Sequence, residues 1–144
     1  MTSGRPLRIA INGYGRIGRC FLRALMESPL RERFTVVAIN DPADLASIAY
    51  LTRFDSTHGR FPGNVELGDG CLLVGGASIP VFHASKPDGV PWKELGVDIL
   101  VEASGQYSYR HELNDFLDPH VFENPSSDRD VRTLIVRAAL GDFL

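Results

Sequence analysis

Cysteine and long apolar runs are scarce in this sequence, and both shortages narrow what the protein can be. Of the 144 residues two are cysteines, Cys20 and Cys71, and their positions match neither a metal-ligand motif nor a disulfide framework. Such cysteine use is typical of a reducing compartment, so we expect a cytoplasmic location and no metal site. No segment approaches the roughly 20 apolar residues of a membrane span, and the N-terminal residues contain no signal-peptide core. We therefore expect no membrane partner.

A surplus of basic residues is also missing. Lysine and arginine number 15 against 18 acidic residues, which gives a formal net charge of −3. Proteins that hold nucleic acid mainly through its phosphates need the opposite balance, so we expect no nucleic-acid partner. The 44% of hydrophobic and 23% of charged residues are ordinary for a globular protein. A chain of this length usually forms a single domain.

The apolar pattern near the N-terminus predicts alternating strands and a helix. LRIAIN (Leu7–Asn12) and FTVVAIN (Phe34–Asn40) are short apolar runs bounded by turn residues, as in strands buried on both faces. Between them Ile17, Phe21 and Leu25 recur at four-residue steps, which is helical spacing. A strand–helix–strand unit implies a right-handed crossover and a parallel sheet. The predicted fold is therefore α/β, a Rossmann-type doubly wound parallel sheet.

The remaining elements are predicted from shorter patterns. A helix is expected over residues 43–52, with Ala46, Ala49 and Tyr50 on one face, Asp41 as its cap and Pro42 as its first residue. Residues 59–85 carry short β-prone pieces between Gly, Asn and Asp, which predicts a small antiparallel insertion. A buried strand is expected over 97–102, a helix over 110–117, a loop over 118–130 and one more strand over 132–136.

Three glycines interrupt the first strand and helix in the pattern G-x-G-x-x-G. In such a junction Gly13 permits a tight turn, Gly15 lets a pyrophosphate approach the backbone, and Gly18 lets the helix pack on the strand. The following helix N-terminus offers amide groups to an anion. The flanking strand and helix make this motif a prediction of dinucleotide binding.

An acid at the end of the next strand completes this prediction. Asp41 follows FTVVAIN, close to the expected interval of about 20 residues after the glycines. Its carboxylate can accept bonds from ribose hydroxyls and would repel a 2′-phosphate, which favours NAD over NADP. Asp41 can also serve as a helix cap, and the two roles are compatible.

Five motifs then identify a resemblance. INGYGRIGR, VVAINDP, YLTRFDSTHGRF, PWKELGVD and VEASGQY occur in the order seen in phosphorylating glyceraldehyde-3-phosphate dehydrogenase, and they are similar to its relative erythrose-4-phosphate dehydrogenase. The resemblance covers about residues 7–117, roughly three quarters of the chain, so we divide the chain into an NAD-binding domain over 1–117 and a divergent tail over 118–144. The resemblance slightly favours the erythrose-4-phosphate branch, but this part of the family mostly carries cofactor contacts and decides little about the substrate.

The resemblance implies NAD as cofactor and assigns its contacts. Asp41 resembles the ribose-binding acid, and Ser104 stands with Gly105 where the family has Thr-Gly beside the nicotinamide. Ser85-Lys86-Pro87 departs from the family's Arg-Asp-Pro, so no contact near the adenine is transferred. The residues that resemble the pyrophosphate loop and its flanks are Asn12, Gly13, Gly15, Arg16, Ile17 and Gly18.

The family's catalytic residues have no counterpart here. Its nucleophile lies in a Ser-Cys-Thr-Thr-Asn stretch with a histidine base farther on, and this sequence has no such stretch. We expect an NAD-binding domain that does not complete turnover alone, from a truncated or frame-shifted copy or an excised domain. The alternatives are a non-catalytic NAD-binding module that pairs with itself or with a full-length dehydrogenase, and a different complete Rossmann oxidoreductase, for which we find no acid or base. For Cys20 and His58 we expect packing and structural roles rather than catalysis.

Overall fold

The computed structural model describes residues 4–56, 58–86, 89–104 and 132–135. The elements are, in chain order, β1 (Leu7–Asn12), α1 (Arg16–Glu27), the 3₁₀ turn η1 (Arg31–Arg33), β2 (Phe34–Asn40), α2 (Leu45–Arg53), β3 (Phe54–Asp55), β4 (Gly59–Arg60), β5 (Val65–Leu67), β6 (Cys71–Val74), β7 (Ala77–Phe82), α3 (Trp92–Leu95), β8 (Ile99–Glu102) and β9 (Arg132–Ile135).

Seven strands form one sheet in the order β5-β6-β7-β2-β1-β8-β9, and β3 pairs separately with β4. From β7 to β9 all neighbouring strands are parallel. The chain winds from β1 through β2 to β7 on one side and then returns to β8 on the other side of β1. This reversal is the topological switch point of a doubly wound sheet. The predicted Rossmann-type α/β fold is confirmed.

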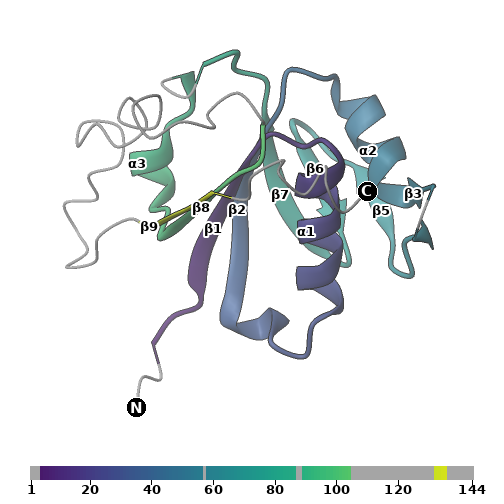
Figure 1. Ribbon diagram of the computed structural model, residues 1–144, viewed down its shortest axis with the longest axis horizontal. Coiled ribbons are helices and arrows are strands. Elements are labelled where there is room, and N and C mark those ends of the chain that lie inside the picture. Colours follow the sequence, from purple (N-terminus) through teal and green to yellow (C-terminus); the bar gives the residue numbers. More distant parts are fainter. Residues whose placement is uncertain (1–3, 57, 87–88, 105–131, 136–144) are drawn as a thin grey trace.

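Both faces of the sheet are covered, as the doubly wound fold requires (Figure 1). On one face Ile9 and Ile11 of β1 pack with residues of α1 and α2, including Leu22 and Ile48. On the other face Ala10, between them in the sequence, packs with the cluster around Trp92 of α3. The period of two along β1 therefore distributes its side chains between two cores.

The antiparallel insertion is also present. β5 pairs with β6, and β6 pairs with β7, both antiparallel, between Val65 and Phe82. β7 then runs parallel to β2, so the insertion extends the main sheet at one edge instead of forming a separate layer.

Helix α2 differs from its prediction. It begins at Leu45, and its N-cap is Asp44, whose carboxylate accepts a bond from the Ser47 amide. Of Ala46, Ala49 and Tyr50, which were expected to share a face, Ala49 is buried while Ala46 and Tyr50 are exposed. The cap prediction failed because two acids precede this helix, and Asp41 is engaged elsewhere.

Other boundaries shift slightly. The strand expected over 97–102 begins at Ile99, and the short helix α3 was not predicted. The strand expected over 132–136 is present as β9 (Arg132–Ile135). The helix over 110–117 and the loop over 118–130 lie outside the described residues.

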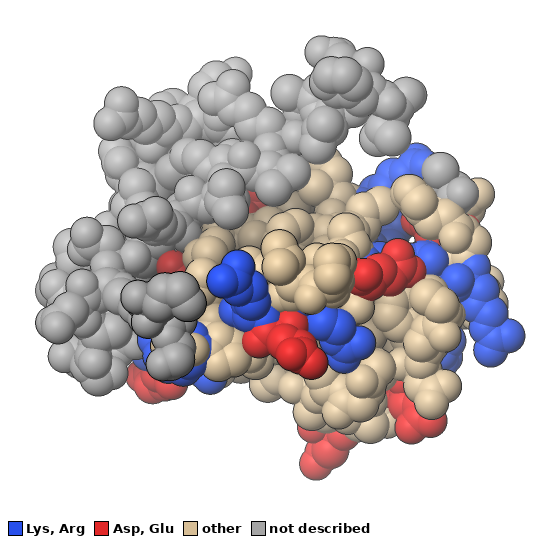
Figure 2. Space-filling view, turned by 90° about the horizontal axis from the view of Figure 1, so that it is seen from below, with Lys and Arg blue, Asp and Glu red and all other residues tan. Residues whose placement is uncertain are grey.

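Acidic and basic side chains are interspersed on the face seen in Figure 2. Among the described helices, none combines the length and apolar character needed to cross a bilayer.

Candidate functional site

A cavity of about 260 Å³ lies where the carboxyl ends of the parallel strands meet the glycine loop. This is the position in which doubly wound sheets bind ligands. Its lining residues come from the ends of β1, β2 and β8 and from the segment after β7: Asn12, Gly13, Gly15, Asn40, Asp41, Pro42, Ala84, Ser85, Lys86, Ala103 and Ser104.

Gly13 makes the turn that ends β1. Its φ of 91° lies in the left-handed region that favours glycine. A Cβ atom at this position would lie 2.3 Å from the Ser104 Cα, because the backbone after β8 passes directly over it. The Gly13 amide donates to the Asn40 carbonyl at 2.8 Å, which fixes the turn against β2.

Gly15 and Gly18 differ in what surrounds them. A Cβ at Gly18 would lie 2.3 Å from the Gly13 carbonyl oxygen, so this position brings helix α1 against the loop. A Cβ at Gly15 would meet no protein atom within 4 Å, and Gly15 lines the cavity. Gly15 is also the N-cap of α1 and makes no side-chain cap bond. The bare backbone at the helix N-terminus is therefore open to an anion.

Asp41 presents its carboxylate at the cavity. One oxygen accepts from the Tyr14 amide at 2.7 Å, and the other accepts from the Ala43 amide at 2.9 Å. A carboxylate has about four acceptor positions, so these two bonds orient Asp41 without exhausting it. The structure thus joins Asp41 to the glycine loop, although the two are far apart in the sequence.

Tyr14 anchors the loop from below. Its side chain is buried, and its hydroxyl donates to Thr52 Oγ1 at 2.7 Å, since the Thr52 proton is used toward the Ile48 carbonyl. Burial raises the pKa of Tyr14 to about 12. The un-ionised Tyr14 hydroxyl therefore links the glycine loop to α2 through its hydrogen bond with Thr52.

A row of buried polar side chains runs beneath the cavity across three strand ends. Glu102 accepts from the Asn12 amide nitrogen at 2.8 Å, and the Asn12 side-chain oxygen accepts from the Asn40 amide at 2.8 Å. Asn40 exchanges two bonds with the backbone of Ala84. At the other end Glu102 accepts from the Ser104 amide and hydroxyl. We refer to the three buried side chains, those of Asn12, Asn40 and Glu102, as the polar row.

Glu102 is the ionisable member of the polar row. It is 2% exposed, and this burial raises the pKa of its carboxyl above the usual 4.5, while its bonds from Ser104 and Asn12 oppose the rise. The row ties Ser104 to Ala84, on opposite sides of the cavity.

The structure brings together some of the residues expected from the sequence and separates others. Asn12, Gly13, Gly15, Asp41 and Ser104 line the cavity. Ile17 and Gly18 follow in the first turn of α1 and do not line it. Gly105 lies outside the described residues.

Arg16 lines a second hollow of about 400 Å³, together with Arg19, Tyr50 and Phe54. Arg16 is the first residue of α1. Arg16 is therefore not among the described residues that line the first cavity.

Sequence reasoning missed Asn40, Glu102, Ser85 and Lys86. The signal for the first two was present, because three apolar strands each end in a polar residue, at Asn12, Asn40 and Glu102. These three residues are register partners across the sheet. Ser85 and Lys86 were set aside where the resemblance departs from its family, yet both line the cavity.

A comparison with protein families places most of the chain in a known family. The family model described as glyceraldehyde 3-phosphate dehydrogenase, NAD binding domain, matches residues 7–110. The match begins with β1, includes the glycine loop, Asp41 and Ser104, and extends past β8. The cofactor is NAD. The residues present fit this cofactor. The absent side chain at Gly15 leaves room for it, the N-terminus of α1 offers hydrogen-bond donors, and the oriented carboxylate of Asp41 offers acceptors.

Proposed function

We propose that this chain forms the cofactor half of a dehydrogenase for phosphorylated aldehydes. The chain belongs to the family of the glyceraldehyde 3-phosphate dehydrogenase NAD-binding domain. The observation that carries the proposal is the meeting of Gly15, the start of α1 and Asp41 at one cavity. NAD, when bound, supplies the acceptor for a hydride.

Each part of the cavity has a matching task. The backbone at Gly15 and the first turn of α1 receives the pyrophosphate, because the absent Cβ leaves room and the helix N-terminus is partly positive. Asp41 accepts hydrogen bonds from the adenosine ribose, since two backbone amides already orient its carboxylate. Ser104, held by Glu102, lies on the nicotinamide side.

Oxidation of the aldehyde needs a nucleophile that we do not assign in this chain. The family's Ser-Cys-Thr-Thr-Asn stretch is absent from the sequence. Cys20 lies in α1 and does not line the cavity. We propose that these 144 residues bind NAD and form no NADH from glyceraldehyde-3-phosphate or erythrose-4-phosphate. Steady NADH formation by the purified chain would refute this part of the proposal.

Calorimetric titration with NAD tests the cofactor site directly. Asp41→Asn should weaken NAD binding about tenfold or more, because a hydrogen bond to a charged group contributes about 1.5–3 kcal/mol. It should also reduce the preference for NAD over NADP, since the charge that repels a 2′-phosphate is removed. Asp44→Asn is the matched control, because Asp44 caps α2 and does not line the cavity. Equal affinities for both variants and the unchanged chain would contradict the assignment of Asp41.

A further inference from the structure

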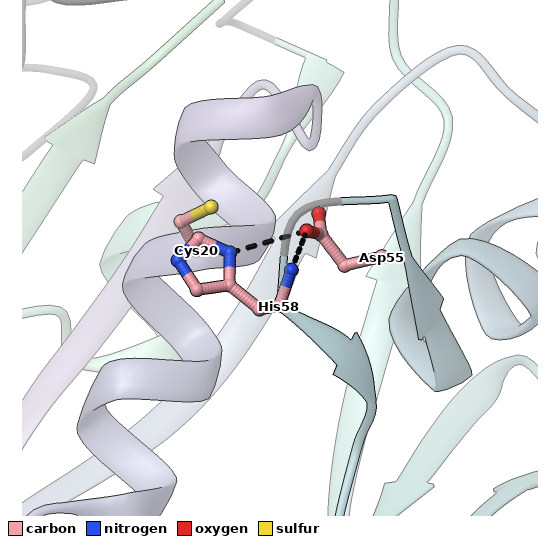
Figure 3. A group of neighbouring side chains, drawn as sticks. All are labelled: Cys20, Asp55 and His58. Atoms are coloured by element: carbon pink, nitrogen blue, oxygen red, sulfur yellow. Dashed lines mark hydrogen bonds and ion pairs between the residues drawn. The ribbon is translucent and has the colours of Figure 1, made fainter.

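Three potential metal ligands meet between α1 and the segment that joins β3 to β4. Cys20 belongs to α1, Asp55 ends β3, and His58 lies in the turn before β4. Figure 3 shows the three side chains directed toward one another across the space between the helix and the turn. One ligand atom from each lies within 4.8 Å of the other two. None of the three lines the cavity assigned to NAD.

Asp55 and His58 are held together by hydrogen bonds. Asp55 Oδ1 accepts from the His58 amide at 2.7 Å and lies 3.1 Å from His58 Nδ1. The Asp55 side chain is 4% exposed and that of His58 is 58% exposed. Asp55 is therefore held in the interior, whereas His58 remains accessible to an ion from solution.

Arg23 fixes this turn against the helix that carries the third ligand. It lies three residues after Cys20 in α1, on the same side of the helix. Its guanidinium donates to the Gly59 carbonyl at 2.8 Å and to the His58 carbonyl at 3.4 Å, and it lies 5.7 Å from the centre of the Phe61 ring. Cys20 and His58 are thus brought together by contacts outside the ligand group itself.

The ligand chemistry selects zinc among common cations. Thiolate and imidazole suit Zn²⁺, while Mg²⁺ and Ca²⁺ prefer oxygen ligands. Ligands of a tetrahedral zinc ion lie about 3.3–3.6 Å apart, close to the 3.1 Å between His58 Nδ1 and Asp55 Oδ1. The three ligand atoms lie within 4.8 Å of one another, so zinc binding must draw the most widely separated of them closer together.

We propose that Cys20, Asp55 and His58 form a Zn²⁺ site between α1 and the β3–β4 turn, with water as the fourth ligand. On binding, the Cys20 thiol releases its proton to solvent, and the thiolate, one imidazole nitrogen and a carboxylate oxygen coordinate the ion. No electron is transferred. The expectation of no metal site rested on sequence spacing, whereas Cys20 meets Asp55 and His58 only in the fold.

Protection of Cys20 from a thiol-alkylating reagent tests this site. The full chain is treated with the reagent in the presence and absence of Zn²⁺, and modification is measured separately at the two cysteines. Cys71 is the internal control, because both cysteines are half-buried and free but Cys71 is outside the ligand group. We expect Zn²⁺ to slow alkylation of Cys20 at least tenfold and to leave Cys71 unchanged. Equal rates at Cys20 with and without Zn²⁺ would overturn the proposal.

Thermal unfolding with Zn²⁺ provides a second readout. Binding to the folded state alone should raise the unfolding temperature of the unchanged chain and of Cys71→Ser. The rise should be lost in Cys20→Ser and in His58→Gln. Far-ultraviolet circular dichroism shows whether each variant folds, and a folded His58→Gln that retains both the rise and the protection of Cys20 would overturn the site. Because NAD and zinc use different residues, failure of one assignment leaves the other standing.

Discussion

Gly15 and Gly18 lie one helical turn apart, yet the surroundings of their absent side chains are opposite. At Gly18 the space is filled by the Gly13 carbonyl, and at Gly15 it is open and borders the cavity. Packing therefore requires one glycine, and the ligand requires the other.

Alanine at these two positions should separate stability from binding. Gly18→Ala should lower the free energy of unfolding by about 1–3 kcal/mol, because backbone must move to admit the methyl group. Gly15→Ala should leave stability within about 0.5 kcal/mol and weaken NAD binding, since its methyl group enters the space meant for the pyrophosphate. Urea unfolding and NAD titration on both variants measure the two effects. A stable, fully binding Gly18→Ala would contradict the close packing.

The buried Glu102 carboxyl should give stability a pH dependence of a defined sign. Its pKa in the folded state is raised by burial above the usual 4.5, so the folded protein binds the proton more tightly than the unfolded chain. The resulting contribution is complete below pH 4.5 and is lost as the pH rises through the folded pKa. Unfolding measured across this range should show the decline in the unchanged chain and not in Glu102→Gln. Parallel profiles for the two proteins would show that Glu102 is not the source.

The glycine loop and Asp41 could be predicted because each follows directly from a short motif. Glu102 and Asn40 could not be assigned in the same way. Their role depends on which strands are neighbours, and β8 lies next to β1 only because the winding reverses there. The role of a polar residue at the end of an apolar strand can be assigned only when its register partner is known.

Helix α2 shows where local patterns are ambiguous. The segment NDPADLAS offers two acids, and proline after the first favours Asp41 as the cap. The structure uses Asp44, because the Asp41 carboxylate turns toward the amide of Tyr14. A tertiary contact decided between two local choices of similar quality. Strands β1 and β2, by contrast, matched their predicted limits, since turn residues bound both runs.

The cap at Asp44 should contribute stability with the opposite pH dependence to Glu102. Bonds from the backbone and hydroxyl of Ser47 lower the pKa of Asp44 below its usual 3.8. The stabilisation is therefore present above pH 3.8 and is lost as the pH falls through the lowered value. Asp44→Ala should reduce the urea midpoint at neutral pH, with a smaller difference from the unchanged chain in strong acid. A difference that stays constant with pH would argue against the charged cap.

The sheet as a whole extends beyond the residues that match the family. The match ends at residue 110, and β9 adds a parallel strand beside β8 at Arg132–Ile135. The run RTLIV predicted this strand, but no local signal could say which edge it would join. The strand order follows from long-range pairing, which sequence patterns alone do not encode.

Shortened chains test the contribution of β9. A chain that ends at residue 131 leaves the outer edge of β8 without this partner, and exposed strand edges promote self-association. A chain that ends at residue 135 keeps β9 and serves as the control. Sedimentation velocity should show concentration-dependent association in the shorter chain alone. Identical profiles for the two chains would mean that β9 does not protect this edge.

The hydrogen bonds of the polar row also determine the orientation of the side-chain amides of Asn12 and Asn40. A carboxylate can only accept, so Asn12 must turn its nitrogen toward Glu102 and its oxygen toward Asn40. Asn40 must then turn its own oxygen toward the amide of Ala84. The negative charge of Glu102 therefore fixes the direction of hydrogen-bond donation, from Asn40 to Asn12 and from Asn12 to Glu102. Protonation of Glu102 would remove this constraint, and the effect would reach the bonds of Asn40 with Ala84 on the opposite side of the cavity.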